Sequence, residues 1–248
     1  MFRHQGKTRR FGHNLGIASL LSFVAGIVNV AGFFSVQRLT TNVTGHFAFF
    51  VDNVFKFNLW EGFVFFLYVF FFFLGAFVSN FLAVLFSRKG HRYVYAVPAS
   101  VECFILFMLG LWGQRLITIS PNTIAFSLLF AMGLQNSLVT KISGSTVRTT
   151  HLTGLFTDLG IELSQLFFFK AREQKNALIS SIKLRLTIIG FFFTGSITGG
   201  ILCSEIGLHA LILAATTLIF GLVYDNIKLR FILLRRKLKT ADKQASNL

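Results

Sequence analysis

The chain contains six apolar stretches that are long enough, or nearly so, to cross a lipid bilayer as helices. They cover residues 15–36, 59–86, 93–113, 119–140, 183–203 and 208–224. A bilayer core about 30 Å thick requires about 20 apolar residues in a helix. Charged residues make up only 13% of the chain, against roughly 25% in soluble domains. We therefore predict an all-α integral membrane protein with six transmembrane helices and no separate soluble domain.

Two shorter apolar stretches, residues 44–57 and 152–169, contain acidic residues. We interpret them as short broken helices that re-enter the membrane or lie at its surface. Loop charges favour six spans with both termini in the cytoplasm, because eight spans would place Arg88, Lys89 and Arg92 outside. The expected layout is a basic cytoplasmic N-terminus at 1–14, a first membrane repeat at 15–113, a second repeat at 119–224 and a basic cytoplasmic tail at 225–248.

Two polar motifs occur once in each half of the chain. Gly-x-x-Asn ends at Asn29 and at Asn136, and Thr-Thr-x-x-Thr-Gly ends at Gly45 and at Gly154. The offsets are 136 − 29 = 107 and 154 − 45 = 109 residues. Three spans per half would insert the two halves in opposite orientations. Such inverted three-helix repeats with interrupted helices are typical of many secondary transporters.

The net charge of +15 does not indicate a nucleic-acid-binding protein. The basic residues gather at the termini and in the loops between apolar stretches, which is the pattern of membrane orientation. Cys103 and Cys203 both fall inside predicted spans, so we interpret them as packing residues. We expect no cofactor, no metal and no nucleic-acid partner.

The polar turns are the candidate substrate-binding residues. A helix that begins inside the membrane presents free N–H groups, which can hold an anion or a carboxylate. The competing interpretation is that Thr150 or Thr153 only caps the helix and that the asparagines only bridge spans. The candidates are Asn29, Thr41, Thr44, Gly45, Gln135, Asn136, Thr150, His151, Thr153 and Gly154.

Two acids are candidates for proton coupling. Glu102 lies within a predicted span, where a carboxylate is costly, and Asp158 shares a helix face with Glu162. His46 and His151 flank the Thr-Gly motifs, but their spacing matches no metal-ligand motif. Interfacial solvation is the simpler interpretation for Asp158.

Gly195-x-x-x-Gly199 and its counterpart Gly75-x-x-x-Ser79 predict close helix packing within or between protomers. We expect a homodimer that uses these residues. The mixed basic and apolar segment at 228–243 predicts a helical extension on anionic headgroups.

At these residues the chain resembles the YoaK-like family of bacterial membrane proteins. The resemblance rests on the segment from Ala25 to Phe33, on Thr44-Gly45, and on the segments 133–136 and 148–154. The family typically has Asp where this chain has Asn29, and Asn where it has His46. The resemblance implies a multi-pass protein of the bacterial inner membrane, and it brings no agreed activity.

Three sequence motifs of enzymes are absent from the chain: a Walker A loop, an HExxH sequence and a Gly-x-Ser-x-Gly elbow. We therefore expect a non-enzyme, an ATP-independent transporter or permease of a small solute whose other partner is the lipid bilayer. The main alternative is a membrane assembly, signalling or stress-related protein that transports nothing.

Overall fold

The computed structural model describes residues 11–88, 94–169, 171–224 and 227, and these residues are helical apart from turns. Because no strand occurs in these ranges, the all-α expectation is confirmed. The basic N-terminus at 1–14 and the basic tail at 225–248 fall mostly outside them. The elements are α1 (Phe11–Val36), α2 (Val43–Phe55), α3 (Leu59–Arg88), α4 (Ala96–Ile119), α5 (Pro121–Ser143), α6 (Leu152–Gln165), α7 (Arg172–Ile206), the 3-10 helix η2 (Gly207–Ala210) and a final helix over residues 211–224.

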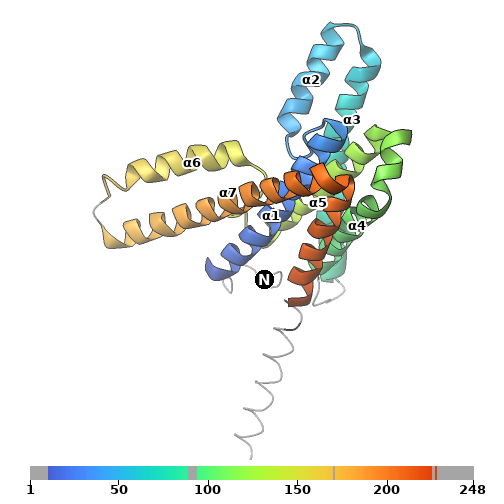
Figure 1. Ribbon diagram of the computed structural model, residues 1–248. Helices are drawn as coiled ribbons and strands as arrows, with labels where there is room; N and C mark the ends of the chain where they lie inside the picture. The colour runs from blue at the N-terminus through green and yellow to red at the C-terminus, as the bar shows by residue number, and fades with distance from the viewer. Residues whose placement is uncertain (1–10, 89–93, 170, 225–226, 228–248) are drawn as a thin grey trace, which may run out of the picture.

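Five helical stretches of the described chain are long and apolar enough to cross a membrane. Four of them are α1, α3, α4 and α5, and the fifth runs for 53 residues from Arg172 to Tyr224. This last stretch contains α7, η2 and the final helix, and the ribbon changes direction at η2 (Figure 1). The sixth span therefore stays a prediction, which requires α7 and the final helix to cross separately.

The central contacts join helices from opposite halves of the chain. Helix α1 packs along α7, and α3 packs along α5. A Cβ atom added to Gly26 would collide with the backbone carbonyl of Phe192, and one added to Gly195 would collide with that of Phe23. Between α3 and α5, a Cβ atom added to Gly133 would collide with the Phe72 carbonyl, and one added to Gly75 would collide with the Phe130 carbonyl. Glycine is required at all four positions because backbone lies directly against backbone.

These two helix pairs repeat at constant offsets. Phe23 and Gly26 precede Phe130 and Gly133 by 107 residues, and Phe72 and Gly75 precede Phe192 and Gly195 by 120. Gly199 extends the first pair, since its added Cβ would meet Ile27. The expected dimer interface at these small residues is therefore wrong, because α1 and α5 of the same chain already occupy it. The expectation of a homodimer itself stays a prediction.

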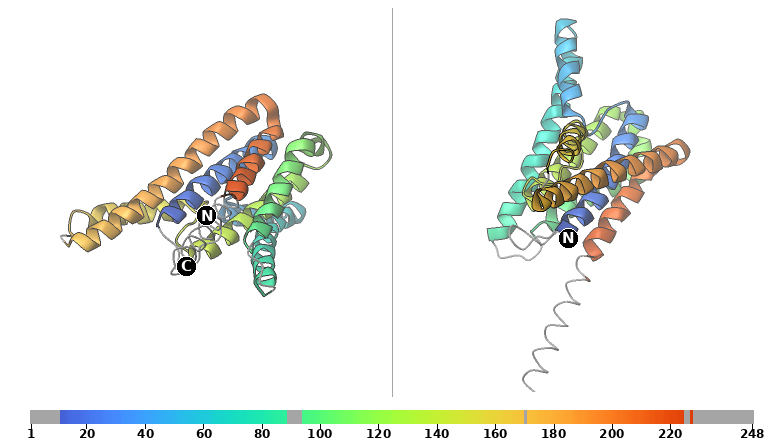
Figure 2. Two further views of the ribbon diagram at one scale, coloured as in Figure 1. Left: turned by 90° about the horizontal axis from the view of Figure 1, so that it is seen from below. Right: turned by 90° about the vertical axis from the view of Figure 1, so that its left-hand side faces the viewer.

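Two hairpins extend from this body in different directions (Figures 1 and 2). In the α2–α3 hairpin, aromatic rings join the helices: Phe49 stacks on Phe65 at 5.2 Å, and Phe50 lies 6.0 Å from Phe66. In the α6–α7 hairpin, polar side chains join the helices instead. The short helices α2 and α6 have 13 and 14 residues and are too short to span a bilayer.

Helix α4 packs against α5 and against the segment around η2. The His209 ring nitrogen Nδ1 lies 2.6 Å from the Gly110 carbonyl, and the Cys103 thiol donates to the Ala215 carbonyl at 3.4 Å. Both cysteines are free and buried, so their prediction as packing residues is confirmed.

Candidate functional site

After α1 ends at Val36, the chain turns back along the same helix. The Thr40 hydroxyl, which is fully buried, donates to the Val28 carbonyl at 3.2 Å, and the Thr41 hydroxyl donates to the Asn29 side-chain oxygen at 2.8 Å. Asn29 precedes Val36 by seven residues, so these contacts lie roughly 10 Å back from the end of α1. Helix α2 therefore starts beside Asn29, about two turns before the end of α1.

The second half repeats this turn after α5. Fully buried Thr149 accepts a hydrogen bond from the Gln135 amide at 3.2 Å, and the Thr150 hydroxyl donates to the Asn136 side-chain oxygen at 2.8 Å. Gln135 also donates to the Leu21 carbonyl at 3.0 Å, which ties the turn to α1. Helix α6 thus starts beside Asn136, again roughly 10 Å back from the end of its preceding helix.

The structure corrects the expected helix caps. Asn42 is the N-cap residue of α2, and its side-chain oxygen accepts from the Gly45 N–H at 3.0 Å. His151 is the N-cap residue of α6, and its ring lies where a Cβ on Gly154 would be. Thr44 and Thr153 sit inside the helices, so a threonine cap is wrong at both. The hydroxyls of Thr41 and Thr150 donate to the asparagine side chains, and neither residue is the N-cap of the helix that follows.

The two turns line one cavity of about 960 Å³, which we call the shared cavity. The first half contributes Asn29, Thr41, Thr44 and Gly45, and the second contributes Asn136, Thr150, His151 and Thr153. Phe72 and Phe192, the residues whose carbonyls face Gly133 and Gly26, also line it. Eight of the ten predicted substrate-binding residues therefore meet in one place. The lining offers hydroxyls, amides and aromatic rings, which suit a hydrogen-bonding solute.

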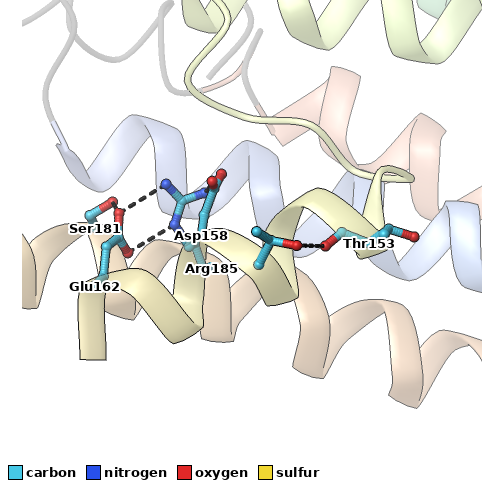
Figure 3. Close-up of polar contacts among 6 residues, drawn as sticks. Thr153, Asp158, Glu162, Ser181 and Arg185 are labelled. Atoms are coloured by element: carbon cyan, nitrogen blue, oxygen red, sulfur yellow. Dashed lines mark hydrogen bonds and ion pairs between the residues drawn. The ribbon is translucent and has the colours of Figure 1, made fainter. Parts of the chain in front are cut away.

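A second cavity of about 380 Å³ lies between the turn before α6 and α7, and we call it the side cavity. Arg148 and His151 line both cavities, whereas Gly154 and Asp158 line only the side cavity. Arg185 of α7 forms ion pairs there with Asp158 at 2.9 Å and with Glu162 at 2.8 Å. Ser181 donates a further hydrogen bond to Glu162 at 2.6 Å, and Figure 3 shows these side chains gathered between α6 and α7.

Glu162 is held ionised by this cluster. Partial burial acts to raise the pKa of Glu162, but the hydrogen bonds from Arg185 and Ser181 and the charge of Arg185 together lower it below its usual value. On α2, burial lowers the pKa of His46, and the nearby Arg38 charge adds to this effect, while a hydrogen bond to the Leu39 carbonyl opposes it. His46 is therefore neutral near pH 7.

The remaining predicted site residues lie outside the shared cavity. Gln135 is fully buried behind the second turn. Asp158 is tied to Arg185, which supports a structural ion pair more than a proton relay. Glu102 is fully buried in α4, and neither of its oxygens has a hydrogen-bond partner among the described residues.

Sequence reasoning missed four residues of the site. The four are Arg148, Arg185, Phe72 and Phe192, none of which was among the predicted site residues. For the phenylalanines a signal existed, since each stands three residues before a glycine of the predicted packing motif. Leu39 also lines the shared cavity, at the position equivalent to Arg148 at the offset of 109 residues.

Comparison with known proteins places these features in a family. A family profile described as a protein of unknown function, DUF1275, matches residues 17–224, from α1 to the end of the final helix. The chain belongs to the DUF1275 family. The YoaK-like proteins that the sequence resembles are members of DUF1275. Neither the curated proteins nor the solved structures contained a match.

Proposed function

We propose that this DUF1275 protein is an ATP-independent membrane transporter of a small solute. The observation that carries the proposal is the shared cavity, which both Thr–Asn pairs line from equivalent positions of the chain. A solute held between two halves of this kind can be exposed to one side of the membrane and then to the other by movement of the halves. The lining contains hydrogen-bonding groups but no nucleophile–base pair, which favours reversible binding over chemistry.

The matched contacts favour two inverted repeats, residues 15–113 and 119–224. In this arrangement α2 and α6 are re-entrant helices that start near the bilayer midplane and return to opposite faces. Irregular backbone at that depth requires protein or water to satisfy its polar groups. The Asn42 side chain accepts from the Gly45 N–H, the Ser143 hydroxyl accepts from the Val147 N–H, and the cavity leaves room for water. The positive-inside rule then puts both termini in the cytoplasm, with α2 towards the outside.

Glu102 is the proton-coupling candidate of this proposal. Its carboxyl group is fully buried in α4 without a partner in the described chain. An acid inside a membrane helix is a functional hypothesis by default. Asp158 is the weaker candidate because Arg185 pairs with it.

Cysteine accessibility tests alternating access without knowledge of the solute. Thr153→Cys is introduced into a protein that lacks Cys103 and Cys203, and a membrane-impermeant thiol reagent is applied to right-side-out and inside-out vesicles. A transporter should be labelled from both sides, because the shared cavity opens to each in turn. Labelling from neither side would favour the non-transporting alternative, and labelling from one side alone would contradict alternating access.

Solute affinity is the second test. Removal of one hydrogen bond costs about 0.5–1.5 kcal/mol, or up to about tenfold in affinity. Asn136→Ala and Thr153→Ala should therefore weaken binding of a solute found by a stability screen, while the protein still inserts and folds. Asn53→Ala is the matched control, because Asn53 does not line the shared cavity and its side chain donates to the Phe49 carbonyl of its own helix.

A further inference from the structure

The two halves of the chain supply matched hydrogen-bonding groups to the shared cavity, but they do not supply matched charges. Among the described residues that line it, Arg148 is the one formally charged group apart from the titratable His151, and none is acidic. The equivalent position in the first half is Leu39, which also lines the cavity. The two halves thus supply matched hydroxyls and amides, and the second half alone supplies a cation.

The side chain of Arg148 is exposed, but its backbone is anchored beside α5. Arg148 directly precedes Thr149, which is fully buried and bonded to Gln135, so its backbone lies well back from the end of α5. Arg38, in the corresponding turn of the first half, is used differently: its guanidinium donates to the Tyr68 hydroxyl and lies 5.1 Å from the Phe65 ring centre.

The acids near Arg148 do not neutralise it. Asp158 lines the same side cavity, but its carboxylate pairs with Arg185, as does that of Glu162. Arg148, Arg185, Asp158 and Glu162 together carry no net formal charge, but both carboxylates pair with Arg185 and neither forms an ion pair with Arg148 in the described chain. Arg148 is exposed, lines both cavities and has no ion pair among the described residues, so its guanidinium is available to a ligand that enters the shared cavity.

We propose that the shared cavity takes an anionic solute, whose carboxylate or phosphate group binds Arg148 while its other polar groups bind the Thr–Asn pairs. This inference rests on the proposed transport function and names the substrate class of the same site. Arginine suits this role because its planar donors match both anions and it stays charged at all physiological pH values. An anionic lipid headgroup carries the same phosphate chemistry, so the test must separate it from a solute.

The test compares two thiol reagents of similar size and opposite charge on Thr153→Cys in the cysteine-free protein. The probes are the sulfonatoethyl and trimethylammonioethyl methanethiosulfonates, and the readout is the ratio of their modification rates. The ratio is normalised to Thr118→Cys, an exposed site at the end of α4. A positive, partly desolvated cavity should favour the anionic reagent by roughly tenfold.

The variants assign this preference to Arg148. Arg148→Gln should reduce the normalised ratio to about one, Arg148→Lys should retain most of it, and Arg38→Gln should leave it unchanged. A ratio near one in the unchanged cavity, or a preference that survives Arg148→Gln, would overturn the proposal. If Arg148→Gln fails to fold, the ratio with Arg148 present still decides, because an uncompensated cation must favour the anionic reagent.

Lipid composition separates the two sources of anion. The ratio is measured in nanodiscs of phosphatidylcholine and again with phosphatidylglycerol added. A similar ratio in both supports a cavity kept for a soluble anion. A preference that disappears when phosphatidylglycerol is present overturns the solute assignment, because the headgroup then occupies Arg148. Labelling of Thr153→Cys from both sides with no charge preference would refute only the anionic class and leave the transport proposal standing.

Discussion

The Thr150 hydroxyl donates to the Asn136 side chain across 2.8 Å, although 14 residues separate them in the chain. This bond fixes the start of α6 beside Asn136, about two turns before the end of α5. Thr41 and Asn29 do the same for α2 and α1 at the same distance. Each asparagine therefore both positions a turn and lines the shared cavity.

A double-mutant cycle tests this coupling. Thr150→Val and Asn136→Ala should each lower the free energy of unfolding, and the double variant should lose less than the sum. The expected coupling is about 1 kcal/mol, the value of one hydrogen bond that is not exposed to bulk water. The measurement is thermal or denaturant unfolding in detergent. Strict additivity of the two losses would show that the bond contributes nothing to the fold.

Topology is tested by single cysteines in a protein that lacks Cys103 and Cys203. Arg88→Cys and Lys175→Cys should react only from the cytoplasm, and Arg115→Cys only from outside, because α2 and α6 are too short to span. Impermeant labelling of intact cells gives the measurement. External reaction of Arg88→Cys would replace six spans with eight.

The packing of α1 against α7 predicts that alanine substitutions at two glycines of α7 have different effects on stability. Gly195→Ala places a Cβ against the Phe23 carbonyl, whereas Gly190→Ala meets nothing within 4 Å. Overpacking at Gly195 should cost about 1–3 kcal/mol of stability, while Gly190→Ala should be neutral or stabilise by up to about 1 kcal/mol. Thermal unfolding of the two variants side by side provides the check. Equal melting temperatures would contradict the backbone contact between α1 and α7.

The α6–α7 hairpin should be acid-sensitive. The pKa of Glu162 is lower in the folded protein than when unfolded, so the unfolded chain binds the proton first as pH falls. The stabilisation is thus complete above the unfolded pKa, about 4.3, and is lost as pH falls through the folded pKa. Unfolding between pH 6 and 3 should show a steeper loss for the unchanged protein than for Glu162→Gln. Glu173→Gln, at an exposed acid in the first turn of α7, is the control and should keep the steep loss.

Glu102→Gln preserves side-chain size and removes the exchangeable carboxyl proton. We expect normal insertion and a flattened pH dependence of solute uptake in proteoliposomes, since no described group depends on the carboxyl oxygens. Glu173→Gln again serves as the control. An unchanged uptake profile would remove Glu102 from the coupling mechanism without affecting the cavity.

Local patterns in the sequence predicted most of the helices. The short apolar stretch at 44–57 corresponds to α2 at Val43–Phe55, and the stretch at 152–169 begins where α6 begins. Helix α7 starts at Arg172, well before the predicted span at 183, because hydropathy detects the part that suits lipid and not the polar turns before it. The predicted break between the stretches 183–203 and 208–224 does correspond to the turn at η2, and the sixth span stays a prediction.

The partners of individual groups were not predictable from local patterns. A threonine before a helix usually caps it, and only the return of the chain along α1 and α5 brings Thr41 and Thr150 to the asparagines instead. The Gly-x-x-x-Gly spacing predicted close contact but not which helix makes it. Arg148 looked like one more loop charge, since its position on a cavity depends on the buried bond of Thr149 to Gln135.

The crossed pairing of α1 with α7 also sets an order of assembly during synthesis. Gly26 and Gly195 are 169 residues apart (195 − 26). At a translation rate of about 5–20 residues per second, α1 leaves the ribosome roughly 8–30 seconds before its main partner. During that interval the face of α1 that carries Gly26 lies against lipid or against other proteins of the insertion machinery. Helices α3 and α5 are closer in the chain and can pair earlier. The nascent protein therefore passes through an intermediate in which α3 and α5 are packed together and α1 and α7 are not.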